Sequence, residues 1–279
     1  MSPNLFEFCK DSNSYKVKPV FFIISIVLHI TLLLWIPGLK GIAFLSPSKE
    51  AIEIKGQDAE IKERLYFDIY WLGIHAGEAA LEAVNNSGAL RITSRAHSAP
   101  FISVFYKVED YAESLVKDGR AVNFRIKQHE GRYRSDKETV FDIDNRRIIY
   151  FDYLKGKKNE HAIADEDVWD FFSGFYYLRS LPLEVGKAIY INIFDSNKFY
   201  KTKVNVLRKE KIEISGRGEV VTVVVKPETK SEGAFHKKSD ILIWLTDDGK
   251  RTPVRVETKV PIGKVIAELK NFVYFDPRE

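Results

Sequence analysis

The chain has 279 residues, 45% of them hydrophobic, which is enough for a sizeable core, and its formal net charge is +4. The charges are mixed along the sequence and form no block of one sign, so the composition does not favour a nucleic-acid-binding protein. Cys9 is the only cysteine, which excludes a disulfide within the chain.

An uncharged apolar segment near the N-terminus predicts a membrane span. Residues 20–36 contain no Asp, Glu, Lys or Arg, and a helix of this length, extended toward Leu45, crosses a hydrocarbon core of about 30 Å. The segment is longer than the apolar core of a secretory signal peptide, and no Ala-x-Ala pattern follows it, which favours an uncleaved signal anchor over a cleaved signal. Lys10, Lys16 and Lys18 precede it, so the positive-inside rule places the N-terminus in the cytoplasm.

The anchor divides the chain into four predicted parts. Residues 1–18 form a cytoplasmic tail and residues 19–45 the transmembrane signal anchor. Residues 46–62 are charged and aperiodic, which is typical of a linker. Residues 63–279 form one β-rich domain, which the anchor places in the periplasm, at the inner membrane.

Alternation of apolar and polar residues predicts β-strands through most of this domain, and Leu65, Phe67, Ile69 and Trp71 give the clearest run. Polar turns recur at short spacing, with hairpin signals at Asp118-Gly119 and Asp248-Gly249. This rhythm predicts an antiparallel curved sheet or a partly open β-barrel and disfavours a parallel βαβ fold. The predicted strands span residues 65–71, 75–84, 90–97, 102–116, 122–128, 133–142, 147–154, 188–194, 200–206, 212–215, 220–225, 240–246, 254–260 and 265–275.

One segment predicts a helix instead. Acidic residues at 165–167 can cap a helix, apolar residues then recur at helical spacing, and Leu181-Pro182 stops the pattern. The helix predicted over residues 165–181 is apolar nearly all round, so it has to be covered on several sides. We therefore expect it inside the concavity of the sheet.

Three segments of this domain together carry a family resemblance. Residues 70–79 read Tyr-Trp-Leu-Gly-Ile-His-Ala-Gly-Glu-Ala, residues 170–179 read Asp-Phe-Phe-Ser-Gly-Phe-Tyr-Tyr-Leu-Arg, and residues 243–248 read Ile-Trp-Leu-Thr-Asp-Asp. In this order and spacing the domain resembles an uncharacterised bacterial envelope family, a domain of unknown function, over most of residues 65–269. The resemblance implies a β-rich domain exported to the periplasm, and it implies no activity.

A shorter resemblance lies in the anchor. Ser25-Ile26-Val27-Leu28-His29 resembles the Ser-x-x-x-His pattern in the membrane helix of TonB-type energy transducers, with Ser25 and His29 on one helical face. An ionisable residue inside a bilayer suggests a proton pathway or a protein partner, here a membrane proton-channel complex. The alternative is a tolerated neutral imidazole. The long Pro-rich periplasmic arm of the transducers is missing from this sequence.

Few residues offer themselves for catalysis. His75 and Glu78 are three apart, so in a strand they point to opposite faces and are poorly placed to cooperate directly. The pair Glu109-Asp110 is a further candidate. The pair Asp247-Asp248 could be half of an acid pair or a cation site, but a hairpin turn explains it better. We predict no catalytic residue, metal site or cofactor, since the sequence contains no Gly-rich phosphate loop and no zinc motif.

Aromatic residues give the last indication of function. For any one of them a place in the core is the simpler interpretation, but taken with the apolar helix they also suit a greasy groove in a curved sheet. The residues predicted to line that groove are Trp71, Trp169, Phe172, Phe175, Tyr176 and Trp244.

The leading hypothesis is therefore a membrane-anchored, non-enzymatic binding or assembly factor for an apolar cell-envelope component, such as a lipid or a lipoprotein-like ligand. The alternatives are a hydrolase of envelope polymers and a TonB-like accessory protein coupled to a proton-channel complex.

Overall fold

The computed structural model describes residues 59–86, 88–163, 167–214, 218–230, 241–260 and 263–274. The predicted cytoplasmic tail and signal anchor lie outside these ranges, and so do Cys9, Ser25 and His29. None of the helices within the described ranges is long and apolar enough to span a membrane. The first strand begins at Ala59, inside the segment predicted as a linker.

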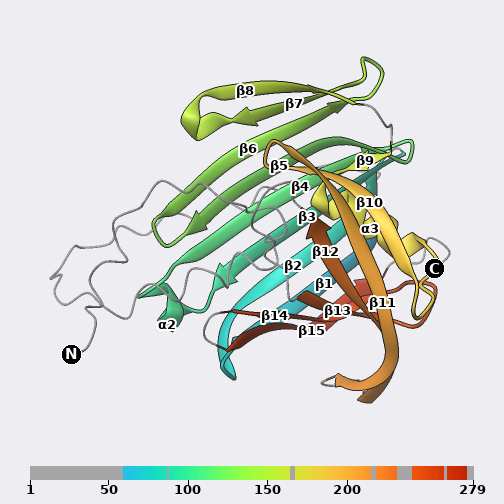
Figure 1. Ribbon diagram of the computed structural model, residues 1–279. Helices are drawn as coiled ribbons and strands as arrows, with labels where there is room; N and C mark the ends of the chain where they lie inside the picture. The colour runs from blue at the N-terminus through green and yellow to red at the C-terminus, as the bar shows by residue number, and fades with distance from the viewer. Residues whose placement is uncertain are drawn as a thin grey trace, which may run out of the picture.

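The described residues form one large, mostly antiparallel sheet of 15 strands with few helices (Figure 1). This confirms the predicted mainly-β class and the curved antiparallel sheet. The strands are β1 (Ala59–Trp71), β2 (Ile74–Asn86), β3 (Ala89–Ser98), β4 (Val108–Lys117), β5 (Arg120–Glu130), β6 (Tyr133–Asp142), β7 (Arg147–Asp152), β8 (Lys157–Ala162), β9 (Val168–Trp169), β10 (Ala188–Asp195), β11 (Lys198–Ile214), β12 (Gly218–Lys230), β13 (Ile241–Thr246), β14 (Pro253–Lys259) and β15 (Lys264–Tyr274). The helical elements are α2 (Pro100–Ser103), the 3-10 turn η2 (Tyr153–Lys155) and α3 (Phe171–Ser180).

Two meanders make up the sheet and meet at its middle. Strands β1 to β8 lie side by side in chain order, and β15 back to β9 do the same on the other side. Among the described pairs only β9 and β10 run parallel. Strand β1 pairs with β15 from Glu63 opposite Tyr274 to Trp71 opposite Val265, so the first and last strands join the two halves. The chain crosses from one outer edge to the other between β8 and β9, and α3 then connects β9 to its neighbour β10.

The strand ends define two margins of the sheet (Figure 1). One margin, called here the α2 margin, carries α2 and the turns β1–β2, β5–β6 and β14–β15. The opposite margin carries the start of β1, the turns β4–β5 and β13–β14, and the end of β15. Asp118 and Gly119 both have positive φ, at 50° and 72°, as in a type I′ turn. The hairpin predicted there is confirmed.

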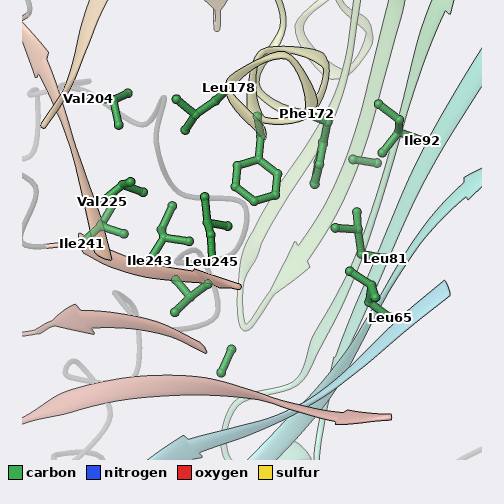
Figure 2. Close-up of a cluster of buried hydrophobic side chains, with 14 of the residues drawn as sticks. Leu65, Leu81, Ile92, Phe172, Leu178, Val204, Val225, Ile241, Ile243 and Leu245 are labelled. Carbon is green, nitrogen blue, oxygen red and sulfur yellow. The ribbon is translucent and has the colours of Figure 1, made fainter. Parts of the chain in front are cut away.

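Helix α3 packs between the two halves of the curved sheet. Figure 2 shows Leu178 on the side of Val204 and Phe172 on the side of Ile92, so the helix contributes apolar side chains to both. Phe172 is 1% exposed and belongs to the main hydrophobic core with residues from nearly every strand. The apolar segment therefore fills the concavity, as its composition requires.

Two predicted boundaries are wrong. The helix begins at Phe171 with Asp170 as its cap, and Val168–Trp169 instead forms β9. A buried strand and a buried helix both place Trp169 in the core, so apolar spacing alone could not separate them. The long strand predicted over residues 102–116 also starts later, at Val108, because Pro100 opens the short helix α2.

Two further strands differ from the prediction. Strand β11 runs without a break from Lys198 to Ile214, where two separate strands were predicted, and a register shift after Val206 accounts for the irregular pattern. Strand β8 occupies Lys157–Ala162, a polar stretch that is mostly exposed and was predicted in part as a turn. An exposed edge strand lacks the apolar alternation on which the prediction depends.

The outer edges of the sheet approach each other through side chains. His161 in β8 donates a hydrogen bond to Oδ1 of Asn197 in the turn β10–β11, at 2.7 Å. Its ring also meets the rings of Phe194 and Phe199 edge-on. Among the described residues no backbone pairing joins β8 to β9. The sheet is thus barrel-like, and side chains instead of strand pairing close its seam.

A buried carboxyl group lies at this seam. Asp195 at the end of β10 is 8% exposed and interacts electrostatically with Lys137 on β6, Tyr150 on β7, Tyr200 on β11 and Asp170. Burial raises the pKa of Asp195 to about 7, against the opposing positive charge of Lys137. The group is therefore protonated in the fold under mildly acidic conditions.

The seam predicts a pH dependence of stability. An unfolded aspartate has a pKa of about 3.9, so the folded chain holds the proton of Asp195 more tightly, and the free energy of unfolding falls as the pH rises from about 4 to about 7. Asp195→Asn removes this titration, so its stability relative to the native chain should increase across that window. Urea unfolding at several pH values measures this, with Asp118→Asn in the exposed turn β4–β5 as the control. A difference that stays constant with pH would contradict the assignment.

Candidate apolar binding site

Helix α3 starts at a buried cap. The Asp170 carboxylate accepts hydrogen bonds from the backbone N–H groups of Phe172 (2.8 Å) and Ser173 (3.1 Å), and the Ser173 hydroxyl donates to the same side chain at 2.6 Å. Ser114 on β4 donates a further bond at 2.7 Å. Burial raises the pKa of Asp170, although these bonds favour its charged form. The cap thus fixes the start of the helix against the first meander.

A buried ion pair fixes the other end of α3. The Arg179 guanidinium donates two hydrogen bonds to the Glu63 carboxylate on β1, at 2.6 and 2.8 Å. It also donates to the carbonyl oxygens of Lys250 and Arg251 in the turn β13–β14. Burial alone would lower the pKa of Arg179, but the bonds to Glu63 raise it above the ordinary value, so the group is charged. The Tyr176 hydroxyl completes the cluster by donating to Glu63 at 2.5 Å.

Two narrow apolar cavities flank α3. The first has a volume of about 30 Å³ and lies under Phe172, against β1, β2, β3, β14 and β15. The second has a volume of about 60 Å³ and lies beside Phe175 and Leu178, against β10 to β13. For comparison, an engineered apolar cavity that binds benzene has a volume of about 150 Å³. The space beside the helix therefore holds at most a small part of a ligand.

A larger pocket opens at the opposite margin of the sheet. Its volume is about 580 Å³, within the range of about 300–1,000 Å³ that is typical of small-molecule sites. The lining consists of apolar side chains from four strands and polar ones from the turn β13–β14. The residues of this end pocket are Ile214, Val220, Thr246, Asp248, Gly249, Lys250, Thr252, Val254, Leu269, Phe272 and Tyr274.

One wall of the end pocket belongs to a two-stranded arm. Strands β11 and β12 pair with each other as far as Ile214 and Gly218, whereas β12 pairs with β13 only from Thr222 to Val225. The rest of this hairpin continues beyond the sheet. Ile214 and Val220 line the pocket from the arm. The arm therefore supplies an apolar wall that is held by fewer strand pairings than the rest of the sheet.

The polar groups of the end pocket lie together on one side. Asp248 accepts hydrogen bonds from the Thr246 hydroxyl and from the backbone N–H groups of Lys250 and Arg251. Burial by itself would raise the pKa of Asp248, but these hydrogen bonds outweigh burial and lower the pKa below its ordinary value. The Lys250 ammonium lies 3.8 Å from the centre of the Tyr274 ring. The pocket thus has an apolar body and a charged rim.

The residues predicted to line a groove occupy several places. Phe172 and Phe175 line the two narrow cavities, and Tyr176 belongs to the ion-pair cluster. Trp169 is buried and stacks on Tyr177. These side chains together fill the interior around α3.

The other two predicted residues lie away from α3. Trp244 donates its indole N–H to Glu210 and has Arg255 over its ring. It is 5% exposed and belongs to the main hydrophobic core. Trp71 is partly buried against the core at the α2 margin, and neither residue lines the cavities beside the helix.

His75 and Glu78 correct one prediction. A register shift in the β1–β2 pair makes Tyr70 oppose His75 and Ile69 oppose Gly77, so one extra residue of β2 lies between them. The bulge reverses the alternation and brings His75 and Glu78 to one face, with Asp68. Ligand atoms of the three lie within 4.8 Å of one another. The Lys270 ammonium already bridges Asp68 (3.1 Å) and Glu78 (3.3 Å), and these bonds raise its pKa.

The remaining acidic candidates take part in local structure. Asp110 is buried and accepts a hydrogen bond from the backbone N–H of His129. Asp247 pairs with Lys209 of the arm at 2.6 Å. With Asp248 holding the turn, these contacts agree with the structural interpretation of the Asp247-Asp248 pair.

Sequence reasoning missed the end pocket. Leu269 is visible as an inward residue of an alternating strand, and so are Val254 and Val220, but inward residues are common to every strand. These three residues line a pocket because β12 overlaps β13 over only a few residues. That overlap depends on the strand register and leaves no local signal in the sequence.

Comparisons with known proteins give a family and a fold. A family model described as a protein of unknown function (DUF3108) matches residues 66–270. A crystal structure of a beta-barrel-like protein of domain of unknown function DUF1849 from Brucella abortus is similar at a TM-score of 0.52 and 12% sequence identity, over 78% of this chain and 99% of that one. At this identity the likeness concerns the fold alone. None of the curated proteins matches the sequence.

The ion pair generates a stability prediction. Glu63→Gln leaves the Arg179 guanidinium buried without its countercharge, which should reduce the free energy of unfolding by about 3–5 kcal/mol. Glu63→Leu combined with Arg179→Met removes both charges and should recover most of the loss. Glu219→Gln, in a pair with Lys211 that is 63% exposed on both sides, is the control and should cost less than about 1 kcal/mol. Urea unfolding followed by tryptophan fluorescence measures all of these. An equal loss of unfolding free energy in Glu63→Gln and Glu219→Gln would show that the buried ion pair does not stabilise the fold more than an exposed one.

Proposed function

This chain belongs to the DUF3108 family of proteins of unknown function, and we propose a function for it from its sequence and geometry, because no relative supplies one. It is a periplasmic, membrane-anchored, non-enzymatic binding protein for an apolar component of the cell envelope. The observation that carries the proposal is the end pocket, whose volume of about 580 Å³ suits a ligand. Its apolar walls and its charged rim fit a molecule with an acyl chain and a polar head.

The distribution of polar groups supports this ligand class. Ile214, Val254 and Leu269 offer only hydrocarbon to the body of the pocket, which favours burial of a chain at about 0.8 kcal/mol per methylene. At the rim, the Lys250 ammonium lies over the Tyr274 ring and can also bind an anionic or strongly polar head group.

The lining gives no support to the hydrolase alternative. Glycoside hydrolysis commonly uses two carboxyl groups about 5 to 9.5 Å apart, and the lining of the end pocket contains one carboxylate, that of Asp248. Three hydrogen bonds hold this group and lower its pKa, which suits a structural acceptor better than a general acid.

The membrane anchor is the part of the proposal that depends on the sequence. Alkaline phosphatase fused after Glu279 should be active in a Gram-negative host, because the apolar segment at residues 20–36 would export everything that follows it. The mature protein should still begin at Met1 or Ser2, which N-terminal sequencing determines. An active fusion that begins near Ser46 would show a cleaved signal, and an inactive fusion would contradict the periplasmic location.

Ligand binding is tested by photocross-linking. A diazirine-labelled fatty acid is added to membranes that contain the full-length chain, and mass spectrometry locates the adduct after illumination. We expect adducts on the strands of the end pocket. Val220→Trp fills the pocket and should reduce labelling at least about tenfold, which corresponds to losing the burial of roughly two methylenes.

The neighbouring residue provides a matched control. Val221 is 45% exposed and does not line the pocket, so Val221→Trp should label like the native chain. Thermal unfolding of both variants shows whether either change disturbs the fold. Labelling that is unaffected by Val220→Trp, or adducts located only elsewhere in the chain, would overturn the binding proposal.

A further inference from the structure

Large apolar side chains are exposed to solvent along the α2 margin of the sheet. Val104 and Phe105, which follow α2, have the two highest exposed fractions among the large apolar side chains of the described residues, at 77% and 74%. Phe101 in α2 is half exposed, and so are Leu72 in the adjacent turn β1–β2 and Ile74 at the start of β2. Figure 1 shows α2 and this turn along the same margin. Such clustering is unusual for a surface that meets only water.

Packing and hydrogen bonds beneath the α2 loop fix the backbone that carries these side chains. The buried ring of Tyr106 packs on Gly131 in the turn β5–β6, where an added Cβ would lie 2.6 Å from the ring. The backbone N–H of Gly131 donates to the carbonyl of Lys107 at 2.8 Å. The hydroxyls of Ser98 and Ser103 hydrogen-bond at 2.7 Å across the ends of the α2 loop. The backbone that carries Phe101, Val104 and Phe105 is therefore fixed.

Cations surround this apolar tip. Three exposed cations lie here: Lys107 in the α2 loop, Arg132 in the adjoining turn β5–β6 and Arg134 at the start of β6. A hydrogen bond from the Gly131 backbone joins the loop and the turn. The exposed acid in this group is Glu109, which pairs with Lys107 at 2.8 Å. The tip thus has excess positive charge around an apolar centre.

We propose that the α2 margin is a membrane-docking surface that binds an anionic lipid bilayer. Phe101, Val104 and Phe105 enter the boundary between head groups and acyl chains, while the nearby cations contact lipid phosphates. Apolar side chains that project beside Lys and Arg are typical of interfacial membrane binding, since burial and attraction to anionic lipids act together.

The docking surface is independent of the proposed ligand site. The end pocket lies at the opposite margin of the sheet, and none of its lining residues belongs to α2 or to the turns β1–β2 and β5–β6. Docking can therefore be tested on variants whose pocket is intact, and failure of one proposal leaves the other standing.

The test uses the full-length chain in phosphatidylcholine nanodiscs, which hold the predicted anchor. Cys9→Ser removes the native thiol, and Phe105→Cys accepts a polarity-sensitive NBD label. Vesicles of phosphatidylcholine, with or without phosphatidylglycerol, are then added. We expect a blue shift of the label and protection from iodide with the anionic vesicles only. A label at Lys117→Cys, in the exposed end of β4 at the opposite margin, should remain in water.

Charge and apolar variants separate the two contributions. Arg132→Ala should weaken vesicle binding about fivefold, as expected for one cation near an anionic surface, and Lys211→Ala on the distant arm should leave it unchanged. Phe101→Ser with Val104→Ser should abolish the blue shift without altering the melting temperature. A label at position 105 that stays in water beside anionic vesicles, or that shifts equally with neutral ones, would overturn the proposal. So would protection that requires a second protein.

Discussion

The buried ion pair between Glu63 and Arg179 is the contact on which the rest of the structure depends. Glu63 lies on the strand at the middle of the sheet, and Arg179 lies in the last turn of α3. The same guanidinium binds the carbonyls of Lys250 and Arg251, which places the turn beside the end pocket. Because a buried charge without its partner is costly, sheet, helix and turn have to move together or not at all. The turn at the pocket rim is therefore held in place by its bonds to the core.

Local patterns were sufficient for most of the fold. Alternation predicts a strand wherever one face is buried, as in β1 from Leu65 to Ile69, and the positive φ values at Asp118 and Gly119 agree with a turn signal readable from two residues. The failures have physical causes. Pro100 starts a helical turn within an alternating run. The cap at Asp170 is made locally with Phe172 and Ser173, but the acidic residues at 165–167 offered a competing start, and the bond from Ser114 on a distant strand is not visible in any local pattern.

The candidate site was harder to predict than the fold. The sequence marks Phe172 and Phe175 as apolar but does not say that they fill the space around the helix. The bulge that brings His75 beside Glu78 arises from strand pairing, so counting along the strand gave the opposite geometry. The end pocket depends on where β12 stops pairing with β13. A binding site formed by an incomplete overlap of strands is a property of the whole sheet and has no motif.

The pairing of β1 with β15 determines when this fold can be completed. During synthesis each strand from β2 to β8 finds the preceding one as its neighbour, so the first meander assembles from local contacts. One edge of β1, however, keeps its backbone N–H and C=O groups unpaired until Lys264 to Tyr274 have been made. An open edge of that length can add a strand from another chain. Nascent molecules therefore pass through an aggregation-prone interval that lasts from the synthesis of β1 to that of β15, and a chain truncated before β15 retains that open edge permanently.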